Sequence, residues 1–566
     1  MPMISIKSDS IIPTEHHFRV SAGPGAGKTH WLVNHIKNVL HNSARLGKSR
    51  KVACITFTNT AVDTILGRLK TTVNQVEVST IHSFLYKHIV KPYASFLAED
   101  YGLNVHAMDG HDDTVLSNYS FLREWKIKTR QQRIHEDKLV VDAFKSLSWR
   151  FSETGALIVR TDYPRKVGRY SITNDSYLVY KRMAWEKGVV HHDDVLFFSY
   201  QLIDKYPFIL NVLRAKFPYF FVDEFQDTNP IQVKIMERIG TGKTVVGIIG
   251  DSAQSIYSFQ GADSSLFYSF NLSNMVDYVM KDNRRSTDYI IDVLNAVRSD
   301  IKQEKFRREK GNKPIIIVGD MHGALSFAKK ESKNEPVCSL SRKVLTSNLM
   351  RKEIKGTEFN NKLIEELLSV DSPSSSNKYR SQVVVSCLKA TEFALESNFN
   401  GAIKELERIF KEKKDKDSVR KEALRYVYLL ISQYEKFKDK SLLEFHSFIK
   451  GSIKPDISNF AKGAAKTFYE SNRYQQLALC VKIEEDASRH KTIHKAKGDE
   501  FKNVLVVLED ESNIDFLLKP NLIDDEEQRI NYVAISRARD RLFINVPTLS
   551  KIKSTKLESM FEVVNI

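Results

Sequence analysis

A glycine-rich loop placed directly before a helix restricts the fold of this chain more than any other feature of its sequence. Residues 22–29 read Ala-Gly-Pro-Gly-Ala-Gly-Lys-Thr. A short segment that could form a strand, residues 18–21, precedes them, and a helical pattern begins near Trp31. Strand, loop and helix in this order form the setting of a phosphate-binding P-loop in an α/β fold. An accidental glycine-rich loop is disfavoured, because all three parts occur in the required order.

The residue types of this loop suit a nucleotide. Its three glycines let backbone N–H groups converge on phosphate oxygens at the start of the helix. Lys28 is predicted to neutralise the β- and γ-phosphates, and the Thr29 hydroxyl to bind Mg²⁺, which prefers oxygen ligands. Ala22 replaces the first glycine of the usual pattern G-x-x-x-x-G-K-S/T, and a small residue suffices where the turn only begins. The predicted nucleotide contacts here are Ala22, Gly23, Gly25, Ala26, Gly27, Lys28, Thr29 and His30.

A second apolar segment ends in the acidic residues that a P-loop requires. Residues 219–227 read Tyr-Phe-Phe-Val-Asp-Glu-Phe-Gln-Asp. Asp223, at the predicted strand end, is expected to hold Mg²⁺ through water, and Glu224 to orient or deprotonate the attacking water. The two carboxylates could instead only cap the next helix, but the presence of a P-loop in the same chain favours the catalytic interpretation.

Short apolar runs recur along the chain and predict strands buried on both faces of parallel sheets. They occupy residues 52–57, 219–224, 245–251, 314–319, 504–510 and 541–546. The runs fall into two groups, before and after residue 275, which predicts two α/β sheet domains. Within each group a charged segment with helical spacing of its apolar residues interrupts the pattern, which indicates an inserted helical subdomain.

This pattern divides the chain into four parts. The first sheet domain is predicted to comprise residues 1–90 and 206–275, with a helical insertion at residues 91–205. The second is predicted to comprise residues 276–345 and 481–566, with a helical insertion at residues 346–480. The fold class is therefore α/β, with two parallel-sheet P-loop domains that are each interrupted by a mainly helical insertion.

Composition limits the setting and the partners. Lys and Arg outnumber Asp and Glu by 86 to 70, a net charge of +16, which is compatible with a nucleic-acid partner or with a merely basic surface. The four cysteines are widely separated, so neither a disulfide framework nor a zinc site is indicated, and a reducing cytoplasm is expected. The sequence contains no recognisable secretion signal and no apolar run long enough to span a membrane.

Further motifs resemble, in order, those of the UvrD/Rep family of superfamily-one DNA helicases. Residues 56–61 (TFTNTA, with Thr60 for lysine), 79–84 (STIHSF) and 223–227 (DEFQD) are similar to TFTNKAA, TxHSF and DExxQD. Residues 250–262 (GDSAQSIYSFQGA) are similar to GDxxQSIYxFRGA, with Gln260 in place of arginine. Residues 283–286 (NRRS), 492–501 (TIHKAKGDEF) and 532–538 (YVAISRA) are similar to NYRS, TIHxAKGLEF and YVAxTRA. The resemblance covers residues 20–545 and is weakest in both insertions.

The resemblance implies two RecA-like domains and gives roles to further polar residues. Gln254, at a strand end beside the carboxylates, is expected to contact the γ-phosphate and Mg²⁺-bound water, although an ordinary strand-end amide is the alternative. Arg285 and Arg537 are implied to reach the γ-phosphate from the second sheet domain as arginine fingers. The expected catalytic set for ATP hydrolysis is Lys28, Asp223, Glu224, Gln254, Arg285 and Arg537.

Recognition of the base departs from the family pattern. Family members stack adenine on the tyrosine of NYRS and read it with an upstream glutamine, whereas Arg284 takes the tyrosine position and residues 1–20 contain no glutamine. Arg284 is expected to stack on the base as a planar cation. In the motif at residues 492–501, Gly498 and Glu500 are expected to contact the nucleotide, Glu500 through the ribose. Preference for ATP over other nucleotides is therefore less firmly implied than hydrolysis.

The nucleic acid along which the protein moves is expected to be single-stranded DNA, bound by aromatic stacking on its bases and by contacts to its phosphates. Each aromatic residue of these motifs could instead be core, and Phe84 is predicted to be core, while Tyr257 and Phe259 are assigned to DNA because they follow the Gln254 loop. The predicted DNA contacts are Phe57, Thr58, Asn59, His82, Ser83, Tyr257 and Phe259. The family implies movement from 3′ to 5′, with 3′-tailed duplex DNA as a further substrate.

The sequence leaves several functions open. A single-stranded DNA translocase and 3′-to-5′ helicase in repair, recombination or anti-phage defence is the first hypothesis. A DNA-sensing ATPase subunit of a nuclease complex, without strand separation, is the second, and an RNA-directed motor the third. The size and motif style also resemble the helicase-like subunit of Gabija-type anti-phage systems, which implies a nuclease partner.

Overall fold

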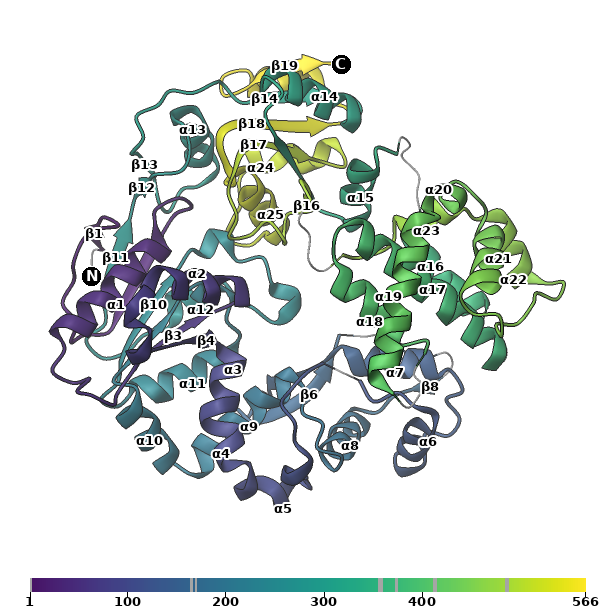
Figure 1. Cartoon of the computed structure of the whole chain (residues 1–566). Helices are drawn as coiled ribbons and strands as arrows, with labels where there is room; N and C mark the ends of the chain where they lie inside the picture. Colours follow the sequence, from purple (N-terminus) through teal and green to yellow (C-terminus); the bar gives the residue numbers. More distant parts are fainter. Residues whose placement is uncertain are drawn as a thin grey trace. The chain divides into compact units, whose positions relative to one another are not determined.

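The computed structural model describes residues 3–113, 115–162, 166–167, 170–354, 360–371, 375–410, 415–483 and 488–566. The chain divides into two compact units. The first contains residues 1–286, 298–308 and 521–529, and the second contains residues 287–297, 309–520 and 530–566. Each unit is built on a large parallel β-sheet, which confirms the predicted fold class (Figure 1).

The first unit holds a seven-stranded sheet in the order β1-β11-β2-β10-β9-β3-β4, with every neighbouring pair parallel. Its strands are β1 (Ile4–Ile6), β2 (Phe18–Ala22), β3 (Val52–Thr56), β4 (Val76–Thr80), β9 (Tyr219–Val222), β10 (Val245–Gly250) and β11 (Val276–Met280). In Figure 1 the purple N-terminal strands therefore lie side by side with strands that follow more than 130 residues later.

The two faces of this sheet bury different helices, which explains its unbroken apolar runs. Along β9, Tyr219 and Phe221 pack into one core with α1 (Lys28–Asn42) and α2 (Asn59–Leu69). Phe220 and Val222 pack into another core with the three helices α9 (His192–Lys205), α10 (Phe208–Lys216) and α11 (Pro230–Gly240). Since successive side chains of a strand point to opposite faces, burial on both faces requires an apolar residue at every position.

The first sheet extends further along the chain than predicted. The predicted boundary at residue 275 is wrong by one strand, because β11 pairs in parallel with both β2 and β1. The segment was misassigned because β11 carries a charged residue, Asp277, which breaks the apolar run. Asp277 Oδ1 lies 3.4 Å from Nη1 of Arg19 on β2. Residues 283–286 follow directly and also belong to the first unit.

The first insertion is mainly helical, as predicted, and adds two short antiparallel ribbons. Its longer elements are α6 (Tyr119–Lys128), α7 (Asp137–Lys145), β5 (Leu147–Phe151), β6 (Leu157–Thr161) and α8 (Asn174–Trp185). Asp194 on α9 is fully buried and pairs with Lys181 at 2.8 Å. Its oxygens also accept hydrogen bonds from the indole N–H groups of Trp149 and Trp185 at 2.9 and 3.0 Å. These contacts give Asp194 a structural role.

The second unit holds a six-stranded parallel sheet in the order β16-β15-β17-β18-β14-β19. Its strands are β14 (Ile315–Val318), β15 (Val337–Ser341), β16 (His490–Thr492), β17 (Phe501–Val507), β18 (Ala538–Val546) and β19 (Glu562–Asn565). The insertion between β15 and β16 has its own apolar core, built from helices that include α17 (Ser375–Leu395), α18 (Phe399–Glu407), α19 (Lys416–Ser432) and α21 (Leu442–Ser452). No helix in the described part of the chain is long and apolar enough to cross a membrane.

Candidate nucleotide site and nucleic-acid interface

The glycine-rich loop connects β2 to α1, as predicted from the sequence. Gly25 and Gly27 have φ angles of 73° and 84°, in the left-handed region that favours glycine, and Gly27 caps the helix. Lys28 and Thr29 begin α1, so the loop N–H groups and the helix N-terminus face the same space. The Lys28 Nζ donates a hydrogen bond of 3.3 Å to the Ala22 carbonyl, which folds the ammonium back over the loop. His30 is exposed, and its Nε2 lies 3.0 Å from the side-chain amide of Asn34.

The predicted acidic pair lies directly after β9. Asp223 is buried, and its N–H donates to the Ile55 carbonyl at 2.8 Å. Glu224 has a φ of 54°, which is strained for a non-glycine residue by about 1–3 kcal/mol, and its N–H donates to Asp223 Oδ1 at 3.1 Å. Burial and the adjacent Glu224 carboxylate raise the pKa of Asp223, while the Lys28 ammonium opposes this shift. The half-buried Glu224 and Lys28 therefore lie close enough to the buried Asp223 to act on its charge.

Three adjacent strands bring four of the six predicted catalytic groups, Lys28, Asp223, Glu224 and Gln254, to one edge of the first sheet. The loop follows β2, the acidic pair follows β9, and Gln254 lies in the turn after β10, between them in the sheet. Ligand sites of parallel α/β sheets lie at these carboxyl ends. Gln254 is buried, and its Nε2 donates to Asp251 Oδ2 at 2.5 Å. Gln226 Nε2 donates to Glu224 Oε2 at 2.6 Å, which fixes the position of the second carboxylate.

The segment of residues 283–286 lies against the loop, which corrects the position expected for Arg285. The Arg284 N–H donates to the Gly25 carbonyl at 2.9 Å, and a Cβ placed on Gly25 would lie 2.8 Å from Arg285 Cβ. Arg285 was expected in the second sheet domain; it belongs to the first unit, with Lys28, because β11 carries the chain into the first sheet just before it.

One residue of this site was missed in the sequence. Gln303 is buried, its Nε2 donates to the Pro24 carbonyl at 2.7 Å, and its Oε1 accepts from Asn283 Nδ2 at 3.2 Å. It therefore ties the loop to the segment that carries Arg284 and Arg285. No local pattern marks Gln303, because its segment returns to the first unit only after the chain has passed through α13 (Asp288–Val297) of the second.

Arg284 has the planar stacking geometry that the sequence suggested, although its observed partner is a side chain. Its guanidinium carbon lies 3.8 Å from the centre of the Phe306 ring. Asp282 holds the same guanidinium at 3.3 Å. Stacking on a nucleobase stays a prediction.

The other predicted nucleotide contacts lie in the second unit. Gly498 has a φ of 90°, and Glu500 and Arg537 directly precede the paired starts of β17 and β18. Arg537 is 2% exposed; its Nε donates to the Val533 carbonyl at 3.1 Å and its Nη1 to the Asp499 carbonyl at 3.3 Å. The structure thus brings Gly498, Glu500 and Arg537 together within this unit.

The predicted DNA contacts of the first unit include an aromatic stack. The rings of Phe57 and Tyr257 are stacked, with centroids 4.8 Å apart, although they are 200 residues apart in sequence. Phe259 lies 5.9 Å from Tyr257 and is 67% exposed. Thr58 and Asn59 are exposed at the start of α2, where the Thr58 hydroxyl caps the helix by accepting from the Ala61 N–H at 3.2 Å.

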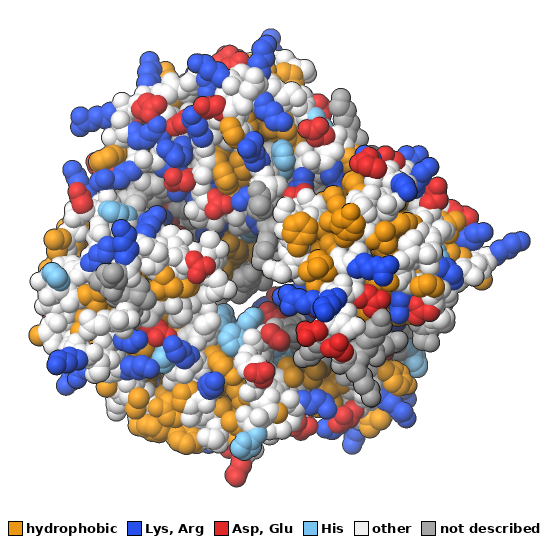
Figure 2. Space-filling view, in the orientation of Figure 1, with side chains coloured by type: hydrophobic (Ala, Val, Ile, Leu, Met, Phe, Trp, Pro, Cys, Tyr) orange, Lys and Arg blue, Asp and Glu red, His pale blue; other side chains and the backbone are white. Residues whose placement is uncertain are grey.

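His82 and Ser83 lie on α3 (Ile81–Leu85), where Ser83 is exposed. Histidine side chains gather near this helix in Figure 2; the His82 ring lies 5.7 Å from that of His192, whose Nδ1 lies 2.6 Å from His111 Nδ1. Burial and the neighbouring histidines lower the pKa of His82 to about 4, so its ring is neutral at pH 7. Phe84 is fully buried against Phe217 and Phe220, which confirms that it is core.

Comparison with known proteins agrees with this arrangement. A family model described as the UvrD/REP helicase N-terminal domain matches residues 5–275, and one described as the UvrD-like helicase C-terminal domain matches residues 389–548. Gabija protein GajB of Bacillus cereus (strain HuB5-5) is 27% identical over 56% of this chain and 50% of its own length. A probable DNA helicase II homolog of Mycoplasma capricolum is 24% identical over 94% of this chain and 83% of its own length. ATP-dependent DNA helicase PcrA of Staphylococcus aureus (strain Mu50) is 24% identical over 96% of this chain and 83% of its own length.

The chain thus spans about half the length of the first of these relatives and most of the other two. The two family models together account for most of the chain, and they include both parallel sheets in part. The chain belongs to the UvrD/REP helicase family.

Proposed function

We propose that this chain is an ATP-dependent single-stranded DNA translocase and a 3′-to-5′ DNA helicase, acting in the cytoplasm in repair, recombination or anti-phage defence. The observation that carries the proposal is the continuity between the two predicted sites. Gln254 and Tyr257 are three residues apart, and Tyr257 stacks on Phe57. Burial, and the carboxylates of Asp227 and Glu224, raise the pKa of the Tyr257 hydroxyl. One turn therefore joins the nucleotide groups to the aromatic surface.

Four of the groups that hydrolysis needs in this proposal, Lys28, Asp223, Glu224 and Gln254, lie in the first unit. Thr29, through its hydroxyl, and Asp223, through water, would hold Mg²⁺, an ion that prefers oxygen ligands. Mg²⁺, when bound, neutralises negative charge on the β- and γ-phosphates. Lys28 binds the same phosphates, Glu224 orients and deprotonates the attacking water, and Gln254 senses the γ-phosphate.

In this proposal the rings of Tyr257 and Phe259 stack on the bases of single-stranded DNA. Replacement of both by alanine is expected to weaken DNA binding by about 1–3 kcal/mol for each lost stack, and basal ATP hydrolysis is expected to change little. The measurement is the concentration of single-stranded DNA that gives half-maximal stimulation of hydrolysis. Leu266→Ala, a change at a half-buried apolar residue later in the same unit, is the control for general loss of packing. An unchanged half-maximal concentration would show that neither ring stacks on bases.

The function itself is tested with a forked duplex. We expect ATP-dependent release of the strand from a duplex with a 3′ single-stranded tail and none from a matched duplex with a 5′ tail. Release from only the 5′-tailed substrate would reverse the proposed polarity. Parallel measurement of hydrolysis with DNA and RNA of one sequence tests the substrate, because greater stimulation by RNA would indicate an RNA-directed motor.

A second candidate function is a DNA-sensing ATPase subunit that acts with a nuclease. The match to Gabija protein GajB, together with the resemblance in size and motif style to the helicase-like Gabija subunit, favours a partner of this kind. Stimulation of hydrolysis by DNA without release of either strand would select this function. Co-purification of this chain with a nuclease from its native host would support the partnership under either function.

A further inference from the structure

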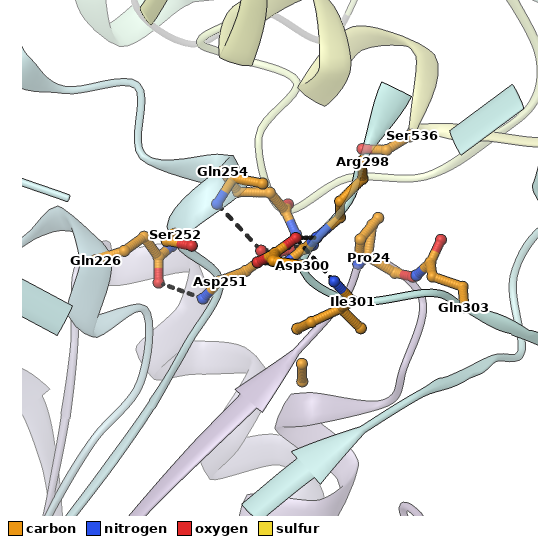
Figure 3. Close-up of polar contacts among 12 residues, drawn as sticks. Pro24, Gln226, Asp251, Ser252, Gln254, Arg298, Asp300, Ile301, Gln303 and Ser536 are labelled. Atoms are coloured by element: carbon orange, nitrogen blue, oxygen red, sulfur yellow. Dashed lines mark hydrogen bonds and ion pairs between the residues drawn. The ribbon is translucent and has the colours of Figure 1, made fainter. Parts of the chain in front are cut away.

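A buried ion pair between Arg298 and Asp251 is joined to Gln254 by a hydrogen bond. The side chains of Arg298 and Asp251 are 1% and 0% exposed, and Arg298 Nη1 lies 2.7 Å from Asp251 Oδ1. The other carboxylate oxygen of Asp251, Oδ2, accepts the hydrogen bond of 2.5 Å from Gln254 Nε2. Figure 3 shows Arg298 and Gln254 reaching the same carboxylate from different sides. Asp251 thus links the guanidinium to the amide that is proposed to meet the γ-phosphate.

The Arg298 side chain is also held from a second direction. Its Nε and Nη2 donate to the two oxygens of Asp300 at 2.5 and 3.0 Å. Burial alone would raise the pKa of Asp300, but its bonds with Arg298 hold that pKa below the ordinary value. The Tyr268 hydroxyl donates to Asp300 at 3.2 Å and lies 3.0 Å from Ser252 Oγ. The turn that carries Gln254 is therefore fixed at both Asp251 and Ser252.

The position of Arg298 in the chain connects this turn to the P-loop. Arg298 begins the segment of residues 298–308, which belongs to the first unit, whereas α13, ending at the preceding residue, belongs to the second. Five residues later, Gln303 donates to the Pro24 carbonyl within the glycine-rich loop. One short segment therefore contacts both the phosphate loop and the support of Gln254.

Stability alone is a weak explanation for the pair. Removing two charges from water is costly, and apolar replacements of buried ion pairs are often neutral or stabilising. The planar guanidinium, in contrast, is held through two bonds to Asp300, which fixes the position of its third nitrogen, Nη1, beside Asp251 Oδ1. This geometry suits a group that must be oriented before it meets the substrate.

We propose that Arg298 is a positioning residue that orients the Gln254 amide, through Asp251, for contact with the γ-phosphate. The inference rests on the proposed role of Gln254 and adds a residue that lies outside the motifs of the sequence. Loss of the guanidinium removes one of the contacts that hold Asp251 and so weakens the constraint on the amide, and hydrolysis slows while nucleotide binding is kept.

The test is a double-mutant cycle of Arg298→Gln and Gln254→Ala, measured as kcat and KM for DNA-stimulated hydrolysis and as binding of a fluorescent ATP analogue. Arg298→Gln alone is expected to lower kcat about tenfold, with KM within about twofold. The double variant is expected to be no slower than Gln254→Ala alone, because both changes remove the same contact. Arg19→Gln, which disrupts the partly exposed ion pair of Arg19 with Asp277 in the same unit, is the control and should leave kcat unchanged.

The outcomes separate this inference from the proposed function. If Gln254→Ala hydrolyses ATP as fast as the native chain, the sensor role of Gln254 is wrong and this inference with it. If Gln254→Ala is slow, and adding Arg298→Gln lowers kcat further by as much as Arg298→Gln does in the native chain, only the positioning role of Arg298 is wrong. Should Arg298→Gln fail to fold, Arg298→Lys replaces it in the cycle, since lysine keeps the charge but cannot hold both carboxylates as a fork.

Discussion

Glu224→Gln is expected to lower ATP hydrolysis by about 10²–10⁴-fold, with binding of the nucleotide kept. Glutamine preserves the size of the side chain and an oxygen that can accept the hydrogen bond from Gln226. It lacks the basic carboxylate that is proposed to take a proton from the attacking water. The measurement is phosphate release in the presence of single-stranded DNA, with a titration of a fluorescent ATP analogue to establish binding.

Glu237→Gln provides the matched control for this prediction. Glu237 lies on α11 of the same unit and pairs with Lys234 at 2.7 Å on the helix surface. Its replacement removes a carboxylate and one surface ion pair, which contributes at most about 1 kcal/mol to stability, so hydrolysis should stay at the native rate. Near-native hydrolysis by Glu224→Gln would contradict the role of Glu224 and leave the acidic pair as a structural feature of the strand end.

The parts of the fold that the sequence could predict are those in which one local pattern has one structural cause. All six apolar runs became strands, because a strand covered on both faces needs apolar residues at successive positions. The loop at residues 22–29 was predictable because its glycines adopt backbone angles that other residues avoid. The β11 strand was missed because Asp277 interrupts its apolar pattern and pairs across the sheet with Arg19.

The unpredicted part of the site depends on contacts between distant segments. Gln303 and Arg298 belong to a short segment that returns to the first unit after a helix of the second, and neither stands in a recognisable motif. Arg285 was placed in the wrong unit for the same reason, since the chain passes between the units more than once. Local periodicity reports which face of an element is buried, but it does not report which element lies opposite.

Arg537→Ala is expected to lower ATP hydrolysis by about 10³–10⁵-fold, the range for an arginine that stabilises the transferring phosphoryl group. The family resemblance assigns this role to Arg537, which belongs to the unit that does not contain Lys28. Its guanidinium donates to the Val533 and Asp499 carbonyls and to the Ser536 hydroxyl, so the position of the side chain within this unit is well fixed. The rate is measured as phosphate release at saturating DNA and ATP.

Truncation of a buried arginine also removes structural hydrogen bonds, so folding must be separated from catalysis. Arg541→Ala, on the adjoining strand β18 and 3.8 Å from Glu331, controls for loss of a cation from this sheet and should retain native hydrolysis. Arg537→Lys keeps the charge without the planar fork and should recover only part of the lost rate. If Arg537→Ala melts like the native chain and still hydrolyses ATP at the native rate, Arg537 only supports the backbone around residue 499, and the arginine finger must be sought elsewhere.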